Sequence, residues 1–162
     1  MLLYHGHRGP FCVHGGLCLA DDITAALSYG EGGYITVGEF DTRGLHRREV
    51  DGYVMDDNEA PGDSPEELAA FAEEGVDYLV YEDSDLNQRD HDTIRLVSPS
   101  ALQAFRPIAS APYEVVDALR DEGYFSWGQI EEEIAEEAYP VADLVEDHGL
   151  ETVRAAWRVL RP

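Results

Sequence analysis

Residues 2–40 read LLYHGHRGPFCVHGGLCLADDITAALSYGEGGYITVGEF, a stretch in which apolar runs alternate with glycine-rich and acidic breaks. Asp21 and Asp22 can cap the N-terminus of a helix, and Gly30 is a typical residue for its end. The run YITVGEF is β-branched and aromatic, which is typical of a strand. The stretch therefore predicts a strand at Leu2–Tyr4, a loop at 7–16, a strand at Leu17–Ala20, a helix at Ile23–Tyr29 and a strand at Tyr34–Phe40.

The middle of the chain has one strong helix signal and two strand signals. Ser64 and Glu67 have the spacing of a capping box around Pro65, so we expect a helix that ends at Gly75. The runs VDYLVY and TIRLV are expected to form a hairpin with a long loop. The expected elements are an irregular segment over 41–63 that has room for one short strand, strands at Val76–Tyr81 and Thr93–Val97, a polar turn at Glu82–Asp92 between them, and a candidate edge strand at Leu102–Ile108.

Beyond residue 108 the sequence changes to helical signals. Pro112 can open a helix that ends near Gly123, and Ser126 with Gln129 has the spacing of a second capping box. Pro140 and Gly149 divide the remainder into two further helical segments. The expected fold is therefore α+β, with one domain over residues 1–108 and an acidic helical extension over 109–162 packed on it.

The chain is strongly acidic. It has 34 Asp and Glu residues against 11 Arg and no Lys, which gives a formal net charge of −23 at pH 7. Residues 1–50 hold 6 of the acids and 4 of the Arg, so the imbalance falls on the rest of the chain. Such a surface repels nucleic-acid backbones and anionic lipids, so we expect neither direct nucleic-acid binding nor membrane binding. It suits a basic or nucleic-acid-binding protein partner, although solubility or a salty habitat explains the charge equally well.

We expect the protein to be located in the cytoplasm, either of the producing cell or of a host cell. No apolar run approaches the ~20 residues of a membrane span. The first residues also lack the basic and then apolar pattern of a secretory signal. Two cysteines are too few for a disulfide scaffold.

Common chemical motifs are missing or weak. The chain has no P-loop, no dinucleotide-binding glycine fingerprint, no nucleophile elbow and no HExxH. One short segment is rich in potential metal ligands, but their spacing matches no standard zinc pattern, so we predict no metal. These ligands are His5, His7, Cys12, His14 and Cys18.

Four pieces of sequence, in order, resemble a known family. They are LYHG at 3–6, a helix ending in Ala-x-x-Tyr at 26–29, GVDYLVY at 75–81 and TIRLVSPSAL at 93–102. Together they resemble the His-Tyr-acid branch of the ADP-ribosyltransferase superfamily, over roughly residues 2–105. The resemblance implies a split antiparallel sheet as the core of the α+β fold, with NAD as the substrate.

The resemblance also assigns roles to single residues. His5 is expected to hydrogen-bond the NAD ribose, Tyr29 to stack on nicotinamide, and Gly6 to let the backbone approach the ligand. Arg8 could pair with the pyrophosphate. The third member of the triad is an acid that binds the ribose and orients the acceptor. The candidates, in order of preference, are Asp83, Glu82 and Asp85. Taken singly, each of these residues has an ordinary structural role as its alternative.

The expected function is mono-ADP-ribosylation of a macromolecule, in first place a protein, by an enzyme of toxin, phage-effector or anti-CRISPR type. Cleavage of the nicotinamide–ribose bond passes through an oxocarbenium-like state, which a placed carboxylate stabilises. Two alternatives stay open. One is a non-catalytic acidic protein, an inactive transferase fold or a DNA-mimic-like inhibitor, that blocks a basic nucleic-acid-binding partner. The other is an enzyme that hydrolyses NAD without a macromolecular acceptor.

Overall fold

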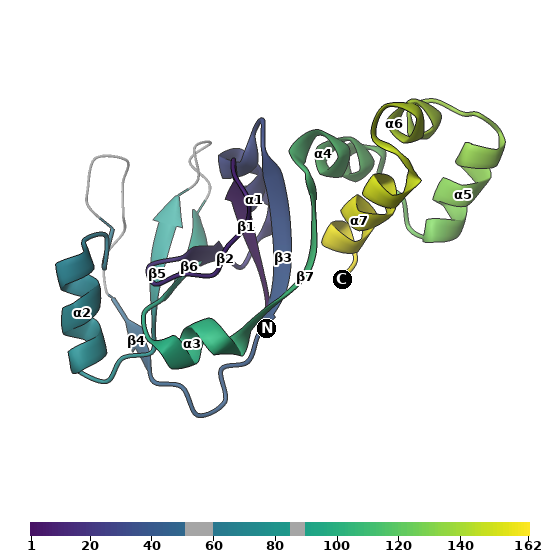
Figure 1. The fold of residues 1–162 in the computed structure, drawn as a ribbon. Helices are drawn as coiled ribbons and strands as arrows, with labels where there is room; N and C mark the ends of the chain where they lie inside the picture. Colours follow the sequence, from purple (N-terminus) through teal and green to yellow (C-terminus); the bar gives the residue numbers. More distant parts are fainter. Residues whose placement is uncertain (51–59, 85–89) are drawn as a thin grey trace.

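A seven-stranded sheet in the order β4-β5-β6-β2-β1-β3-β7 forms the centre of the molecule (Figure 1). The computed structural model describes residues 1–50, 60–84 and 90–162. Neighbouring strands are antiparallel except β4 and β5, which are parallel. The strands are β1 (Leu2–His7), β2 (Cys18–Ala20), β3 (Tyr34–Phe40), β4 (Arg47–Glu49), β5 (Tyr78–Ser84), β6 (Asp90–Leu96) and β7 (Phe105–Pro112).

The helices begin where the sequence provides caps. Asp22 accepts from the Thr24 amide at the start of α1, and Ser64 caps α2 with Pro65 in its first turn. Ser126 and Gln129 form the expected capping box. The described structure is therefore α+β, as predicted. The helices are α1 (Ile23–Gly30), α2 (Pro65–Glu73), α3 (Pro99–Ala104), α4 (Tyr113–Glu122), α5 (Trp127–Ala135), α6 (Val141–His148) and α7 (Leu150–Leu160).

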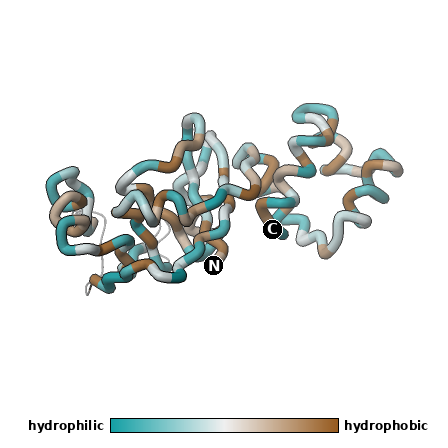
Figure 2. Tube along the Cα trace, turned by 60° about the horizontal axis from the view of Figure 1, so that its bottom comes forward, coloured by the Kyte–Doolittle hydropathy of each residue, from teal (hydrophilic) through white to brown (hydrophobic). Residues whose placement is uncertain are grey.

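The helical extension shares a hydrophobic core with the sheet. Val115 of α4 and Val153 of α7 are fully buried in one cluster with Ile35 and Val37 of β3. Hydrophobic and hydrophilic segments alternate along the extension, as expected for helices that bury one face (Figure 2). A second cluster, which includes Leu3, lies around β1, β2, β5 and β6.

Three boundaries differ from those expected. β1 continues to His7 instead of ending at Tyr4. The segment 99–104 is helical, and the edge strand β7 follows it and ends at Pro112, beyond the expected boundary at residue 108. The expected polar turn at 82–92 is shorter, because β5 continues to Ser84 and β6 begins at Asp90. Asp83 therefore lies within a strand.

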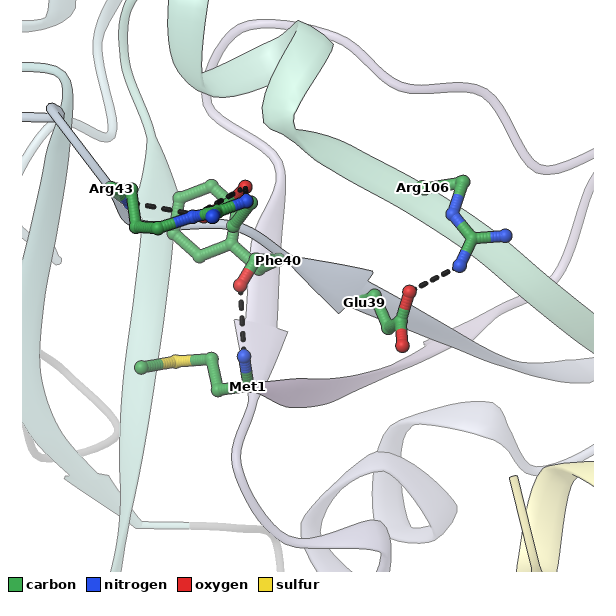
Figure 3. Close-up of polar contacts among 6 residues, drawn as sticks. Met1, Glu39, Phe40, Arg43 and Arg106 are labelled. Carbon is green, nitrogen blue, oxygen red and sulfur yellow. Dashed lines mark hydrogen bonds and ion pairs between the residues drawn. The ribbon is translucent and has the colours of Figure 1, made fainter.

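The first strand is anchored at the end opposite its histidines. The Met1 ammonium donates to the Phe40 carbonyl at 2.9 Å, and Arg106 of β7 forms an ion pair with Glu39 of β3 (Figure 3). The register of β1 with β3 is continuous from Leu2 to His7. Among the helices in the described part of the chain, none has the length and apolar character needed to cross a bilayer.

Candidate functional site

A cavity of about 270 Å³ is lined by residues of β1, β2, α1, β5 and β6. Four of the side chains or backbone positions predicted from the sequence line it: His5, Gly6, Tyr29 and Asp83. They come from three elements separated by many residues in the chain. The fold therefore brings the expected histidine, tyrosine and first-choice acid to one place.

Asp83 is the acid that faces this cavity. Successive residues of a strand point to opposite faces, so Glu82 lies on the other face of β5, where it is exposed and pairs across the ladder with Asp92. Among the described residues Asp83 is the only carboxylate in the cavity lining. Its Oδ1 accepts from the Ser84 amide at 2.8 Å, and its Oδ2 lies 3.4 Å from the Thr93 hydroxyl. Asp85, the third-choice acid, falls outside the described residues.

His5 is held at the junction of β1 and β2. The register joins these strands at Tyr4 and Ala20, and the Nδ1 of His5 lies 2.8 Å from the Cys18 carbonyl. A carbonyl only accepts, so Nδ1 carries the proton and Nε2 of the neutral ring keeps a lone pair. Burial is the main cause that lowers the pKa of His5. The hydrogen bond to Cys18 raises this pKa by less, and the nearby His7 and His14 lower it further. Nε2 of His5 can therefore accept a hydrogen bond at neutral pH.

Gly6 is required first of all by the packing of α1. A Cβ at this position would lie 2.1 Å from the Ala26 carbonyl oxygen and 2.5 Å from the Gly30 nitrogen, both backbone atoms of α1. The sequence suggested a close approach to a ligand. The structure shows a close approach to a helix, which sets the distance from β1 to Tyr29 at the end of α1.

Tyr29 connects α1 to β5 beside the acid. Its hydroxyl donates to the Ser84 carbonyl at 3.0 Å, and its ring centre lies 6.4 Å from that of His91 at an angle of 59°. The residue is 42% exposed, so part of its ring surface is accessible from solvent. An aromatic face next to a carboxylate can hold a flat cationic heterocycle.

Arg8 does not line the cavity. It is exposed in the segment just after β1. The cation that does line the cavity is Arg95 of β6, whose side chain is 7% exposed and donates to Asp63 at 2.9 Å. Its Nε is buried without a hydrogen-bond partner in the described structure. Its guanidinium lies 6.0 Å from the ring centre of Tyr81, a phenol whose pKa is raised chiefly by burial.

Three further cavity residues were missed from the sequence. His91 was placed in a loop, and Thr93 and Arg95 were read only as strand residues. The alternation in DHDTIRL contains the signal, because His91, Thr93 and Arg95 occupy every second position and share one face. Recognising it requires knowing that the strand begins at Asp90 and which face is toward the cavity.

The described residues contain no group of three or more His, Cys, Asp or Glu side chains placed to hold a metal ion. Cys12 and Cys18 are free thiols.

The chain matches no protein-family model, no curated protein and no solved structure. The cavity and the residues that line it are therefore the features that point to a function.

Proposed function

We propose that this protein is an NAD-dependent mono-ADP-ribosyltransferase with an ADP-ribosyltransferase-like fold, and that the cavity holds the nicotinamide and its ribose. The observation that carries the proposal is the meeting of His5, Tyr29 and Asp83 in one cavity. The sequence resemblance predicts all three residues. Their convergence from β1, α1 and β5 is what such a site requires.

Each residue has a group suited to one part of the reaction. Asp83 can stabilise positive charge as the ribose C1′ separates from nicotinamide. Nε2 of His5 can accept from a ribose hydroxyl, and the Tyr29 ring can lie against the nicotinamide. The bond to nicotinamide breaks with its electron pair on the leaving ring nitrogen. A nucleophile of the target bonds to C1′, and its proton passes to the Asp83 carboxylate and then to solvent.

The charge of the chain supports a basic protein as the target. A net charge of −23 accelerates encounter with a positively charged surface and disfavours nucleic acid as the acceptor. An enzyme of toxin, phage-effector or anti-CRISPR type that modifies a nucleic-acid-binding protein fits this charge. The main competing proposal is a non-catalytic acidic protein that occupies the same basic surface.

The test is nicotinamide release from NAD, with and without a bacterial protein extract, together with transfer of label from biotinylated NAD to the proteins of that extract. We expect release and labelling by the wild type and loss of both in Asp83→Asn. Glu82→Gln is the matched control, because it removes a neighbouring carboxylate on the opposite face of the same strand. It should keep wild-type rates.

The outcomes separate the candidate functions. Release that needs the extract and accompanies labelling supports the transferase. Equal release without any protein acceptor supports an NAD glycohydrolase instead. No release, with salt-sensitive binding to basic proteins that Asp83→Asn leaves intact, would replace the enzyme with the acidic binding protein.

A further inference from the structure

The β5–β6 hairpin places two polar residues, His91 and Thr93, beside Asp83. Asp83 is paired across the ladder with His91, and Tyr81 is paired with Thr93. Directly opposed residues of antiparallel strands point to the same face, so Asp83, His91 and Thr93 all face the cavity. His91 is 8% exposed and Thr93 is 4% exposed.

Thr93 lies between the other two polar groups. Its Oγ1 is 3.2 Å from Nε2 of His91 and 3.4 Å from Oδ2 of Asp83. An ionised carboxylate can only accept, so the single hydroxyl proton of Thr93 goes to Asp83. The Thr93 oxygen then accepts from His91, which requires a proton on Nε2. The hydrogen bonds therefore run in one direction, from His91 through Thr93 to Asp83.

This series of hydrogen bonds holds the second oxygen of the Asp83 carboxylate. The Ser84 amide already donates to Oδ1 of Asp83 at 2.8 Å. With Oδ2 held by Thr93, both oxygens have protein donors on the sheet, and the carboxylate keeps one orientation. Because His91 and Thr93 are buried, the hydrogen bond between them is stronger than the same bond in water. A carboxylate fixed in advance needs no reorganisation when charge develops next to it.

We propose that His91 and Thr93 are positioning residues that orient the Asp83 carboxylate toward the ribose C1′ of NAD, an inference that rests on the proposed function. In hydrolysis, the simplest case, the C1′–N bond breaks and its electron pair leaves with neutral nicotinamide. A water oxygen bonds to C1′, and its proton passes to the Asp83 carboxylate and then to solvent. Thr93 and His91 touch none of the reacting atoms and act only through Asp83.

The test compares variants that keep or remove each donor. Thr93→Val keeps the shape and removes the hydroxyl, whereas Thr93→Ser keeps the hydroxyl. His91→Gln can place an amide N–H near the position of Nε2, whereas the shorter His91→Asn cannot reach it. The rate measured is nicotinamide release from NAD under the condition in which the wild type is active, with thermal unfolding as a check on folding.

We expect Thr93→Val and His91→Asn to lower kcat about ten- to a hundredfold. The KM for NAD should change by less than about twofold, because the lost interaction acts on the reacting state. Thr93→Ser and His91→Gln should recover most of the rate. Wild-type kcat in Thr93→Val, or equal rates in His91→Gln and His91→Asn, would overturn the inference while leaving the proposed function in place.

One readout does not depend on catalysis. Side-chain ¹⁵N NMR, with the His91 signals assigned by their absence in His91→Gln, reports which ring nitrogen carries the proton. The hydrogen-bond chain requires a proton on Nε2 of His91. A His91 ring protonated only at Nδ1 would contradict the proposed hydrogen bonds, whatever the activity. Absence of nicotinamide release by the wild type would instead remove the catalytic role of these residues together with the proposed function.

Discussion

Replacing Gly6 by alanine should destabilise the protein and loosen the cavity together. The new Cβ would meet two backbone atoms of α1, at 2.1 Å and 2.5 Å, well below the 3.4 Å at which ordinary van der Waals contact begins. Backbone atoms cannot rotate away as a flexible side chain does, so α1 has to move back from β1. Overpacking of this kind costs about 1–3 kcal/mol, and we expect the upper part of that range.

The effect can be measured by thermal or urea unfolding. For a chain of this length, each kcal/mol lowers Tm by about 2–4 °C, so a loss of about 2–3 kcal/mol in Gly6→Ala should lower Tm by about 4–12 °C. Gly15→Ala is the matched control, because a Cβ there has no atom within 4 Å and its φ is not positive. A shift of Tyr29 with α1 should also raise the KM for NAD. Equal Tm values for the two variants would refute the close packing of β1 against α1.

Three further predictions test other contacts. Burial lowers the pKa of His5 from 6.5, so the unfolded chain binds this proton at a higher pH than the folded protein. The wild type should therefore lose more unfolding free energy than His5→Gln as the pH drops below about 6.5. Unfolding free energies of the two proteins that fall in parallel with pH would contradict the burial of the ring. Asp63→Asn removes the charge that pairs with the buried Arg95 and should cost about 1–3 kcal/mol of unfolding free energy. Asp41→Asn, which breaks the exposed ion pair with Arg43, should leave urea unfolding unchanged. Equal effects of the two variants would show that burial of Arg95 does not strengthen its ion pair. Tyr29→Phe keeps the ring and loses the hydrogen bond to the Ser84 carbonyl, so its KM for NAD should stay within about threefold of the wild type. Tyr29→Ala also loses the ring and should raise KM about tenfold or more. An equal rise of KM in both variants would show that the hydroxyl, and not the ring, is the group needed for NAD binding.

Local signals predicted the helices well. Ser64 with Pro65, and Ser126 with Gln129, lie next to the amides that they satisfy, so their effect can be read from a few neighbouring residues. The same holds for Asp22 at the start of α1. These helices were therefore expected at nearly the right residues, whereas the short helix α3, which Ser98 caps in the same way, was not expected.

The strands next to the site were harder to predict. The ends of β5 and β6 carry Glu82 and Asp92, acidic residues that are rare in buried strands and typical of turns. They fit a strand here because both lie on its exposed face. That face is set by the register with distant strands, which no local pattern reports. The positions of His91 and Thr93 beside Asp83 depend on the same register.

The last strand was predicted in part, because an edge strand was expected at Leu102–Ile108 and β7 lies at Phe105–Pro112. The segment from Phe105 to Pro112 contains Pro107, which argues against a strand inside a sheet. Proline is tolerated on an edge, and β7 is the edge strand next to β3, where the register shifts between Val37 and Gly38. The place of a strand in the sheet order therefore decides whether its sequence is acceptable.

The most direct test of the proposed site is a crystal structure of Asp83→Asn with NAD, since this variant should bind the dinucleotide without cleaving it. We predict the nicotinamide ring against Tyr29, a ribose hydroxyl within hydrogen-bond distance of Nε2 of His5, and C1′ facing the side chain at position 83. NAD bound at another surface, or a cavity that stays empty at saturating NAD while the protein is folded, would contradict the account.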